Sequence, residues 1–244
     1  MTMESSAYVN QLLFGYYPYI ALVVFFLGSL LRFDREQYTW KSDSSQLLHR
    51  GQLRWGSNLF HVGILGIFGG HFGGLLTPLS VWHALGVTAS AKQMLAIVAG
   101  GIAGLMCLVG ISLLTHRRLF DPRIRANSSF GDTAILLLLF AQLLIGLATI
   151  PVSMGHLDGH EMVKFMTWAQ GILTLQPDVA ANVLDVHPIF KAHLLLGMTL
   201  FLVFPFTRLV HVWSAPIWYL GRRGYQVVRS PNGDRMSRPT QPAE

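Results

Sequence analysis

The stretch "NLFHVGILGIFGGHFGGLLTP", residues 58–78, decides the fold class of this 244-residue chain. It contains no Asp, Glu, Lys or Arg over about the length that a helix needs to cross a bilayer. Two histidines, His61 and His71, lie within it among six glycines. Because an ionisable residue is costly at membrane depth, these histidines require a functional explanation.

Apolar runs of similar length occur four more times along the chain. The composition agrees, since 52% of the residues are hydrophobic and only 12% are charged, whereas a soluble domain carries about 25% charged residues. We therefore expect an all-α integral membrane bundle of five transmembrane helices, with one domain over residues 1–220 and a basic cytoplasmic tail over 221–244. The expected spans are Tyr8–Leu31, Ser57–Thr77, Gln93–Thr115, Asp132–Val152 and His187–Trp213.

The positive charge is unevenly distributed between the two sides of the predicted bundle. The segments after the first, third and fifth spans hold most of the arginines, whereas the other side holds only Lys92, Lys164 and Lys191. The positive-inside rule then places the N-terminus outside and the C-terminus in the cytoplasm. A net charge of +6 distributed in this way indicates membrane topology and lipid contact, not nucleic-acid binding.

Two further features limit the chemistry and the architecture. Cys107 is the only cysteine, so disulfides, thiolate iron–sulfur clusters and Cys-based zinc sites are excluded within this chain. In the long outer loop, "EMVKFMTWAQGILTL", residues 161–175, has a helical apolar period. We expect this segment to lie on the membrane surface or to pack over the bundle.

Four histidines lie within or near the ends of the apolar runs. With span two running outward and span five running inward, His71 and His193 come near the outer face. His61 and His211 come near the inner face. Opposed imidazoles from two helices are the ligands that a six-coordinate haem iron needs, so the pattern predicts two haem sites.

The spacing along the helices supports this interpretation with one mismatch. His193 and His211 are 18 residues apart, about five full turns, so both face the same way on a continuous helix. His61 and His71 are about 80° apart and separated by roughly 15 Å, against roughly 27 Å on span five. A kink at Pro205 would shorten the axial separation of the two histidines on span five and bring it closer to that on span two.

Other interpretations of the same residues remain open at this point. Gly63, Gly66, Gly70 and Gly74 form a glycine stripe on span two, with Gly69 and Gly73 beside it, and such a stripe is also typical of close helix packing. Interhelical hydrogen bonds could explain one histidine, and a proton relay could explain several. Zinc would need ligands clustered within a few ångströms, which separations of ten and eighteen residues do not offer.

Several long motifs resemble a known family. "YPYIALVVFFLGSLLRFDREQYTWKSDSSQ", "SNLFHVGILGIFGGHFGGLLTP", "AKQMLAIVAGG", "RRLFDPRIRA" and "HLLLGMTLFLVFPFTRLVHVWSAP" are similar to the gamma subunit of membrane-bound respiratory nitrate reductase. This family is a dihaem cytochrome b that anchors the enzyme. The similarity runs from about Tyr16 to Leu220, with the motifs in order and in spacing.

The resemblance implies two b haems and a quinol substrate, either menaquinol or ubiquinol. His71 and His193 would bind the outer, lower-potential haem, and His61 and His211 the inner, higher-potential one. Quinol oxidised near the outer haem would release protons outside, and its electrons would pass through both haems to an iron–sulfur beta subunit and a molybdenum-containing alpha subunit in the cytoplasm. The family also implies a bacterial or archaeal cytoplasmic (inner) membrane.

Some further site residues follow from this resemblance. Lys92, in "AKQM", matches a family lysine that would hydrogen-bond a quinone carbonyl, although a lysine here could also snorkel to headgroups. Gly70 would let the quinol ring approach, and His71 would face it. The haem propionates, being anionic, would bind arginines on the inner side. The candidates are Arg54, Arg117, Arg118 and Arg208.

Two alternative functions stay open on the sequence. One is a quinol-reactive dihaem subunit of a heterodisulfide-reductase-like or sulfite-reductase-associated complex, which would share the haem-binding spans. The other is a non-redox anchor or proton-coupled transporter that uses the histidines as a relay. The second predicts a colourless purified protein.

Overall fold

The computed structural model describes residues 3–40, 50–215 and 221. Within these ranges the chain is helical, and five helices are long and apolar enough to cross a membrane, which confirms the predicted fold class. These spans are Ala7–Arg35, Gly51–Leu76, Ala89–Phe120, Phe130–Met154 and Pro188–Phe206. The α-helices are α1 (Met3–Gln11), α2 (Tyr17–Arg35), α3 (Arg50–His71), α4 (Leu79–Ala84), α5 (Ala89–Phe120), α6 (Pro122–Ala126), α7 (Phe130–Met154), α8 (His160–Leu173) and α9 (Pro188–Val203).

Short π- and 3₁₀-helical segments connect or extend these helices. The π-helical segments are η1 (Leu12–Tyr16) and η3 (Phe72–Leu76). The 3₁₀ segments are η2 (Gln37–Thr39), η4 (Val179–Val183), η5 (Phe204–Phe206) and η6 (Arg208–Ser214). Residues 1–211 form one compact unit, to which the description below refers. The second unit is 212–244, and the predicted tail 221–244 lies outside the described residues except for Gly221.

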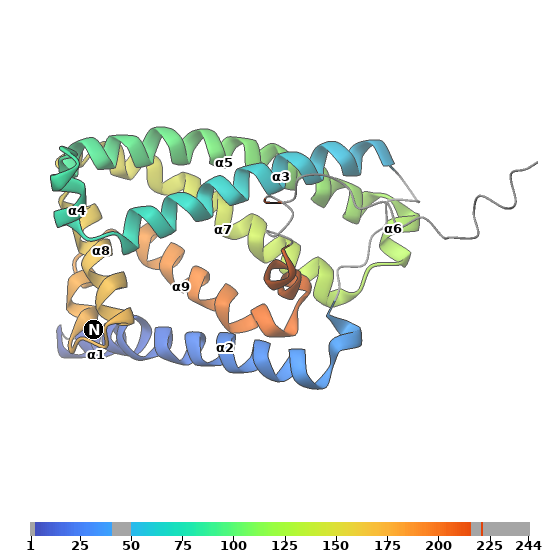
Figure 1. Ribbon diagram of the computed structural model, residues 1–244, viewed down its shortest axis with the longest axis horizontal. Coiled ribbons are helices and arrows are strands. Elements are labelled where there is room, and N and C mark those ends of the chain that lie inside the picture. The colour runs from blue at the N-terminus through green and yellow to red at the C-terminus, as the bar shows by residue number, and fades with distance from the viewer. Residues whose placement is uncertain (1–2, 41–49, 216–220, 222–244) are drawn as a thin grey trace, which may run out of the picture. The chain divides into compact units, whose positions relative to one another are not determined.

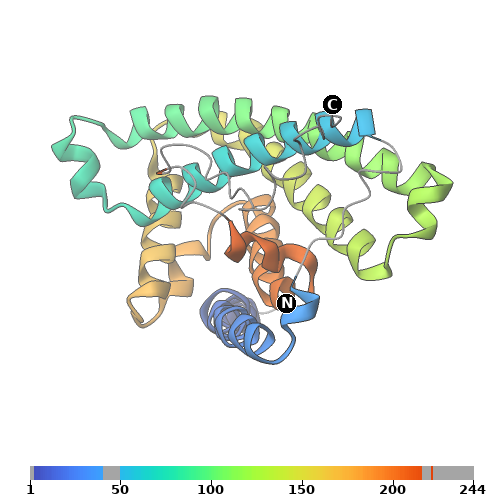
Figure 2. The same ribbon diagram turned by 45° about the vertical axis from the view of Figure 1, so that its right-hand side comes forward.

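Two helix groups make up the first unit (Figures 1 and 2). In one, α3 lies along α5 at close range, because glycines occupy the contact. A Cβ on Gly63 would lie 2.6 Å from the backbone nitrogen of Cys107, and a Cβ on Gly110 would collide with the backbone of Phe60. In the other group, α9 packs on α2 and α7. Since α7 also packs on α5, it joins the two groups.

The amphipathic segment of the long loop forms α8, which covers the end of the unit that carries α4. Trp168 of α8 is buried and donates its indole N–H to the Phe14 carbonyl at 2.9 Å. Gln170 donates to the carbonyl of Leu75 at 2.8 Å. The helix therefore packs over the bundle, as one of the two sequence-based expectations stated. We call this end the α4 end and the opposite one the α6 end.

The fifth span departs from the expected helix over His187–Trp213. The α-helix ends at Val203, a 3₁₀ turn holds Phe204–Phe206, and Thr207 is extended with φ −121° and ψ 175°. Pro205 is the physical cause, because it lacks an N–H and its ring clashes with the preceding turn. The predicted kink is thus a full break. The argument that His193 and His211 share a face after five turns of continuous helix is wrong.

Candidate functional site

The structure brings the four membrane-depth histidines together in two pairs. The rings of His71 and His193 have their centres 6.2 Å apart, with planes at 42°. The rings of His61 and His211 have their centres 6.5 Å apart, with planes at 65°. Each pair takes one ring from α3 and one from the fifth span. The outer pair, His71 and His193, thus joins two helices of different packing groups, α3 and α9.

In three of these histidines a backbone carbonyl holds the Nδ1 atom. His61 Nδ1 lies 2.7 Å from the Ser57 carbonyl, and His71 Nδ1 lies 2.8 Å from the Ile67 carbonyl, each one turn earlier on α3. His211 Nδ1 lies 2.6 Å from the Arg208 carbonyl. An Nδ1–H donated to a carbonyl fixes the tautomer and leaves Nε2 as the ligating atom, which is the usual arrangement of metal-binding histidines.

The distances between the paired rings fit an iron with two axial imidazoles. Two metal–nitrogen bonds of about 2 Å each, together with the two ring radii, span roughly 6 Å from ring centre to ring centre. Among the described residues no three His, Cys, Asp or Glu side chains gather as a metal site. Two-ligand sites of this kind suit a metal whose remaining ligands come with it, as in haem.

His193 has surroundings that sequence analysis did not identify. Its Nδ1 is buried and has no hydrogen-bond partner among the described residues, which is costly for a ring nitrogen. Gln142 of α7 donates to the His193 carbonyl at 3.1 Å. Gly146, one turn later, receives the ring, since a Cβ there would lie 2.8 Å from His193 Cε1. The signal available in the sequence was Gln142, a polar residue in the middle of an apolar span.

At the α6 end, two of the four candidate arginines share one carboxylate. Arg118 of α5 and Arg208 of η6 each lie 3.7 Å from a different oxygen of Asp132, at the start of α7. The Asp132 carboxylate thus brings two guanidinium groups from different elements close together. Of the other two candidates, Arg117 is buried and Arg54 is exposed.

Lys92 lies under α8 at the α4 end, close to Gly74, which follows His71 by three positions. Its side chain is buried, and Nζ donates to the Gly74 carbonyl at 2.5 Å. Two thioether sulfurs complete its surroundings, Met166 Sδ at 3.0 Å and Met162 Sδ at 3.4 Å. Nζ also lies 5.4 Å from the centre of the Trp82 ring. This burial argues against a lysine that reaches lipid headgroups.

The glycine stripe of α3 divides into two parts. Gly63 and Gly66 lie against α5, so close helix packing accounts for them. For Gly69 and Gly70, and for Gly73 and Gly74 in η3, nothing lies within 4 Å of a built Cβ. The open part flanks His71.

The sequence comparisons agree on one family. Residues 10–231 match the family model described as nitrate reductase gamma subunit. The chain is 50% identical over 223 residues to the respiratory nitrate reductase 1 gamma chain of Escherichia coli, covering 91% of this chain and 98% of that protein. It is 40% identical over 221 residues to the nitrate reductase gamma chain of Bacillus subtilis, covering 90% and 98%. A match of 33% identity covers 95% of this chain and 35% of the nitrate reductase-like protein NarX of Mycobacterium tuberculosis.

Proposed function

The chain belongs to the nitrate reductase gamma subunit family, and from this we propose that it is the quinol-oxidising dihaem cytochrome b of a respiratory nitrate reductase. The two facing histidine pairs are the observation that carries the proposal. The family and the five spans make it a multi-pass membrane subunit of an oxidoreductase complex. The identity of its relatives favours nitrate reductase over heterodisulfide-reductase-like or sulfite-reductase-associated partners.

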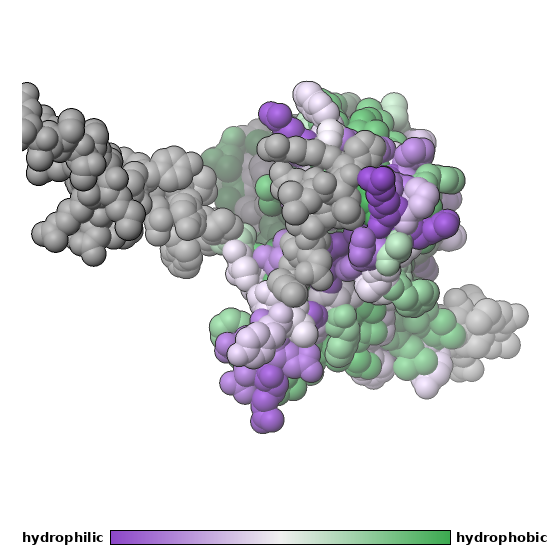
Figure 3. Space-filling view, turned by 90° about the vertical axis from the view of Figure 1, so that its right-hand side faces the viewer, coloured by the Kyte–Doolittle hydropathy of each residue, from purple (hydrophilic) through white to green (hydrophobic). Residues whose placement is uncertain are grey.

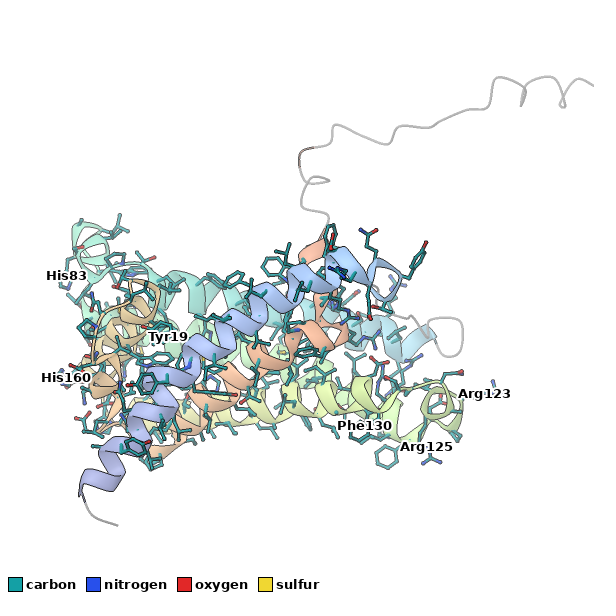
Figure 4. The ribbon with its side chains drawn as sticks, turned by 90° about the horizontal axis from the view of Figure 1, so that it is seen from below. Tyr19, His83, Arg123, Arg125, Phe130 and His160 are labelled. Atoms are coloured by element: carbon teal, nitrogen blue, oxygen red, sulfur yellow. The ribbon has the colours of Figure 1, made fainter. Side chains whose placement is uncertain are left out.

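We assign the α6 end to the cytoplasm of a bacterial inner membrane. Figure 4 shows Arg123 and Arg125 at this end and His83 and His160 at the other. Hydrophilic residues gather where Figure 3 looks onto the α6 end, beside hydrophobic flanks that suit lipid. Basic residues on one side support a cytoplasmic face, with the N-terminus outside. The iron–sulfur and molybdenum-containing subunits would dock on this basic face and on the tail 221–244.

The two histidine pairs would each hold one b haem, which supplies a one-electron acceptor when bound. His71 and His193 would ligate the outer group, and His61 and His211 the inner one. The carbonyls of Ser57, Ile67 and Arg208 would keep three of these rings oriented. Arg118 and Arg208 would bind anionic propionates at the cytoplasmic side, because their guanidinium groups lie close together beside Asp132.

Quinol would bind at the α4 end beside His71. The Lys92 ammonium would donate to a quinol oxygen, because its present acceptors include two thioether sulfurs, which are weak acceptors. Gly70 carries no side chain where the ring would approach. Oxidation of one quinol to quinone removes two electrons and two protons. At this end the protons would leave to the outside, while the electrons would go to the cytoplasmic subunits.

The test is a dithionite-reduced minus oxidised spectrum of the purified membrane protein, with pyridine haemochrome quantification. We expect two b haems per chain, with His71→Ala and His211→Ala each losing a different one. His160→Ala, at an exposed position of α8, is the matched control and should keep both. A colourless protein, or variants that lose nothing, would contradict the proposal and favour a polar relay.

A further inference from the structure

The break in the fifth span leaves backbone carbonyls that α9 cannot satisfy. The last carbonyls of any helix lack intrahelical partners, and the segment Pro205–Thr207 adds irregular backbone beyond them. In a membrane such backbone is tolerated only where other protein groups satisfy it. A specific partner is therefore required next to this segment, which leads directly into the residues around His211.

Arg32, in the last turn of α2, is this partner. Its Nη1 donates to the Pro205 carbonyl at 2.7 Å and to the Thr207 carbonyl at 2.8 Å. Its Nη2 donates to the Thr39 carbonyl at 2.8 Å, which ties the same guanidinium to the chain after α2. A planar guanidinium with several donors can hold three carbonyls in a fixed arrangement, which a lysine ammonium on a flexible stem does less well.

Gly28 lies one turn before Arg32 on α2 and receives the proline ring. A Cβ at this position would lie 2.9 Å from Pro205 Cγ and 3.0 Å from its Cβ. Real Cβ atoms do not approach so closely, and a proline ring has little freedom to move aside. Gly28 and Arg32 together form a site on α2 that we call the Pro205 seat.

The segment held by the Pro205 seat leads within six residues to the inner histidine. Thr207 Oγ1 accepts from the Leu209 amide at 3.3 Å, at the start of η6. The Arg208 carbonyl lies 2.6 Å from His211 Nδ1, so it sets the ring orientation. A shift of Thr207 would therefore move the carbonyl that orients His211. The outer ligand His193 lies on α9 before the break and is held by α7 instead.

We infer that Arg32 and Gly28 are positioning residues for the inner haem ligand, acting on His211 through the carbonyls of Pro205 and Thr207. This inference rests on the proposed function, since it requires His211 to be a ligand. It assigns to α2 a role in the inner site although α2 supplies no ligand. A general role in packing would instead affect the inner and outer sites alike.

The experiment compares the two low-spin haem signals of full-length variants in membranes by electron paramagnetic resonance. The signals should be separable, because the ring planes of the two pairs cross at different angles, 42° and 65°. In Arg32→Gln and in Gly28→Ala we expect the inner signal to shift, or to disappear with a fall in haem content toward one per chain, while the outer signal stays. Arg32→Lys should restore part of the inner signal, because one ammonium can reach only some of the carbonyls.

Two controls separate positioning from charge and from packing. Arg35→Gln removes an exposed arginine of the same helix turn, which among the described residues forms an ion pair with the neighbouring Asp34. Tyr17→Phe removes another α2–α9 hydrogen bond, that of Tyr17 Oη with Thr199 Oγ1 at 2.9 Å. Both controls should keep both signals. Unchanged signals in Arg32→Gln and Gly28→Ala, or equal loss of both, would overturn the inference. A wild-type protein without haem would instead refute the proposed function.

Discussion

Lys92 carries a charge that the surrounding residues compensate weakly. One carbonyl and two thioether sulfurs surround its ammonium at the α4 end. We expect Lys92→Met to lower kcat/KM for quinol roughly 10- to 100-fold, since hydrogen bonds from charged groups contribute about 1.5–3 kcal/mol. Haem content should stay unchanged. Quinol-dependent kinetics of purified membranes would measure this.

The matched control for this substitution is Lys191→Met. Lys191 lies on the same side of the membrane and also donates to a carbonyl, that of Leu184 at 2.5 Å, but it has no part in the proposed quinol site. Its kinetics should equal those of the wild type. If both variants, or neither, lost quinol oxidation, a specific role of Lys92 would be refuted.

Gly146 lets the ring of His193, the proposed outer ligand, lie close to α7 because it has no side chain. A methyl group there would lie 2.8 Å from His193 Cε1, so Gly146→Ala should displace the ring and remove the outer haem. Gly101→Ala is the control, because its Cβ would make only an ordinary contact of 3.7 Å with Ile150. Reduced-minus-oxidised spectra check both. Retention of two haems in Gly146→Ala would show that α7 does not constrain His193.

At the residue scale, the sequence indicated candidate site residues but not the contacts that hold them. The four histidines and Lys92 are visible because charged or ionisable groups are rare in apolar runs. Gly146 and Gln142 contact His193 only because α7 packs beside α9. Gly28 contacts Pro205 only because α2 packs beside α9. Periodicity describes the faces of one helix and not the choice of its neighbour, so these positions could not be predicted.

Among the elements, the fifth span shows the limit of the helical pattern most clearly. Pro205 predicted a kink, yet the apolar run continues past it, so the pattern gave no sign that α9 ends at Val203. The first four spans agree with the predicted runs to within a few residues at most ends. The third and fourth spans follow capping residues, Thr88 and Ser129, whose side chains accept from the amides of Ala91 and Asp132.

Helix α8 is tied to the loop that follows it by a small ion-pair network. Lys164 Nζ donates to Asp185 at 2.8 Å and to Glu161 at 3.0 Å. These hydrogen bonds raise the pKa of Lys164 above its ordinary 10.5, and the bond from Lys164 holds the pKa of Asp185 below its ordinary 3.8. The Asp185 contribution is present above 3.8 and is lost as the pH falls through the lowered pKa. The Lys164 contribution is present below 10.5 and is lost at more alkaline pH.

We therefore expect protection of the loop 174–187 to stay constant between these limits and to fall at acid pH. Hydrogen exchange of the detergent-solubilised protein measures it. Asp185→Asn should already show reduced protection at neutral pH and lose the acid transition. Asp178→Asn is the control, because Asp178 has φ +54°, a conformation that Asn adopts readily. An acid transition that persists in Asp185→Asn would contradict this assignment.

For the whole molecule, the proposed orientation in the membrane can be tested by labelling a single introduced cysteine. Cys107 is the only cysteine and is fully buried, so the natural chain gives no labelling background. A membrane-impermeant maleimide applied to intact cells should label His83→Cys and leave Arg123→Cys unlabelled until the cells are opened. The reverse pattern would invert the topology and place the proposed quinol site in the cytoplasmic half.

The π-helical segment η3 has a consequence for insertions and deletions. A π turn holds one residue more than an α turn, so the end of η3 is offset by one residue from an α-helical continuation of α3. One residue removed from Phe72–Leu76 could be absorbed by a return to α-helical geometry. One residue removed between His61 and His71 would rotate one ring by about 100° against the other. A one-residue deletion should therefore be tolerated within Phe72–Leu76 but not between His61 and His71.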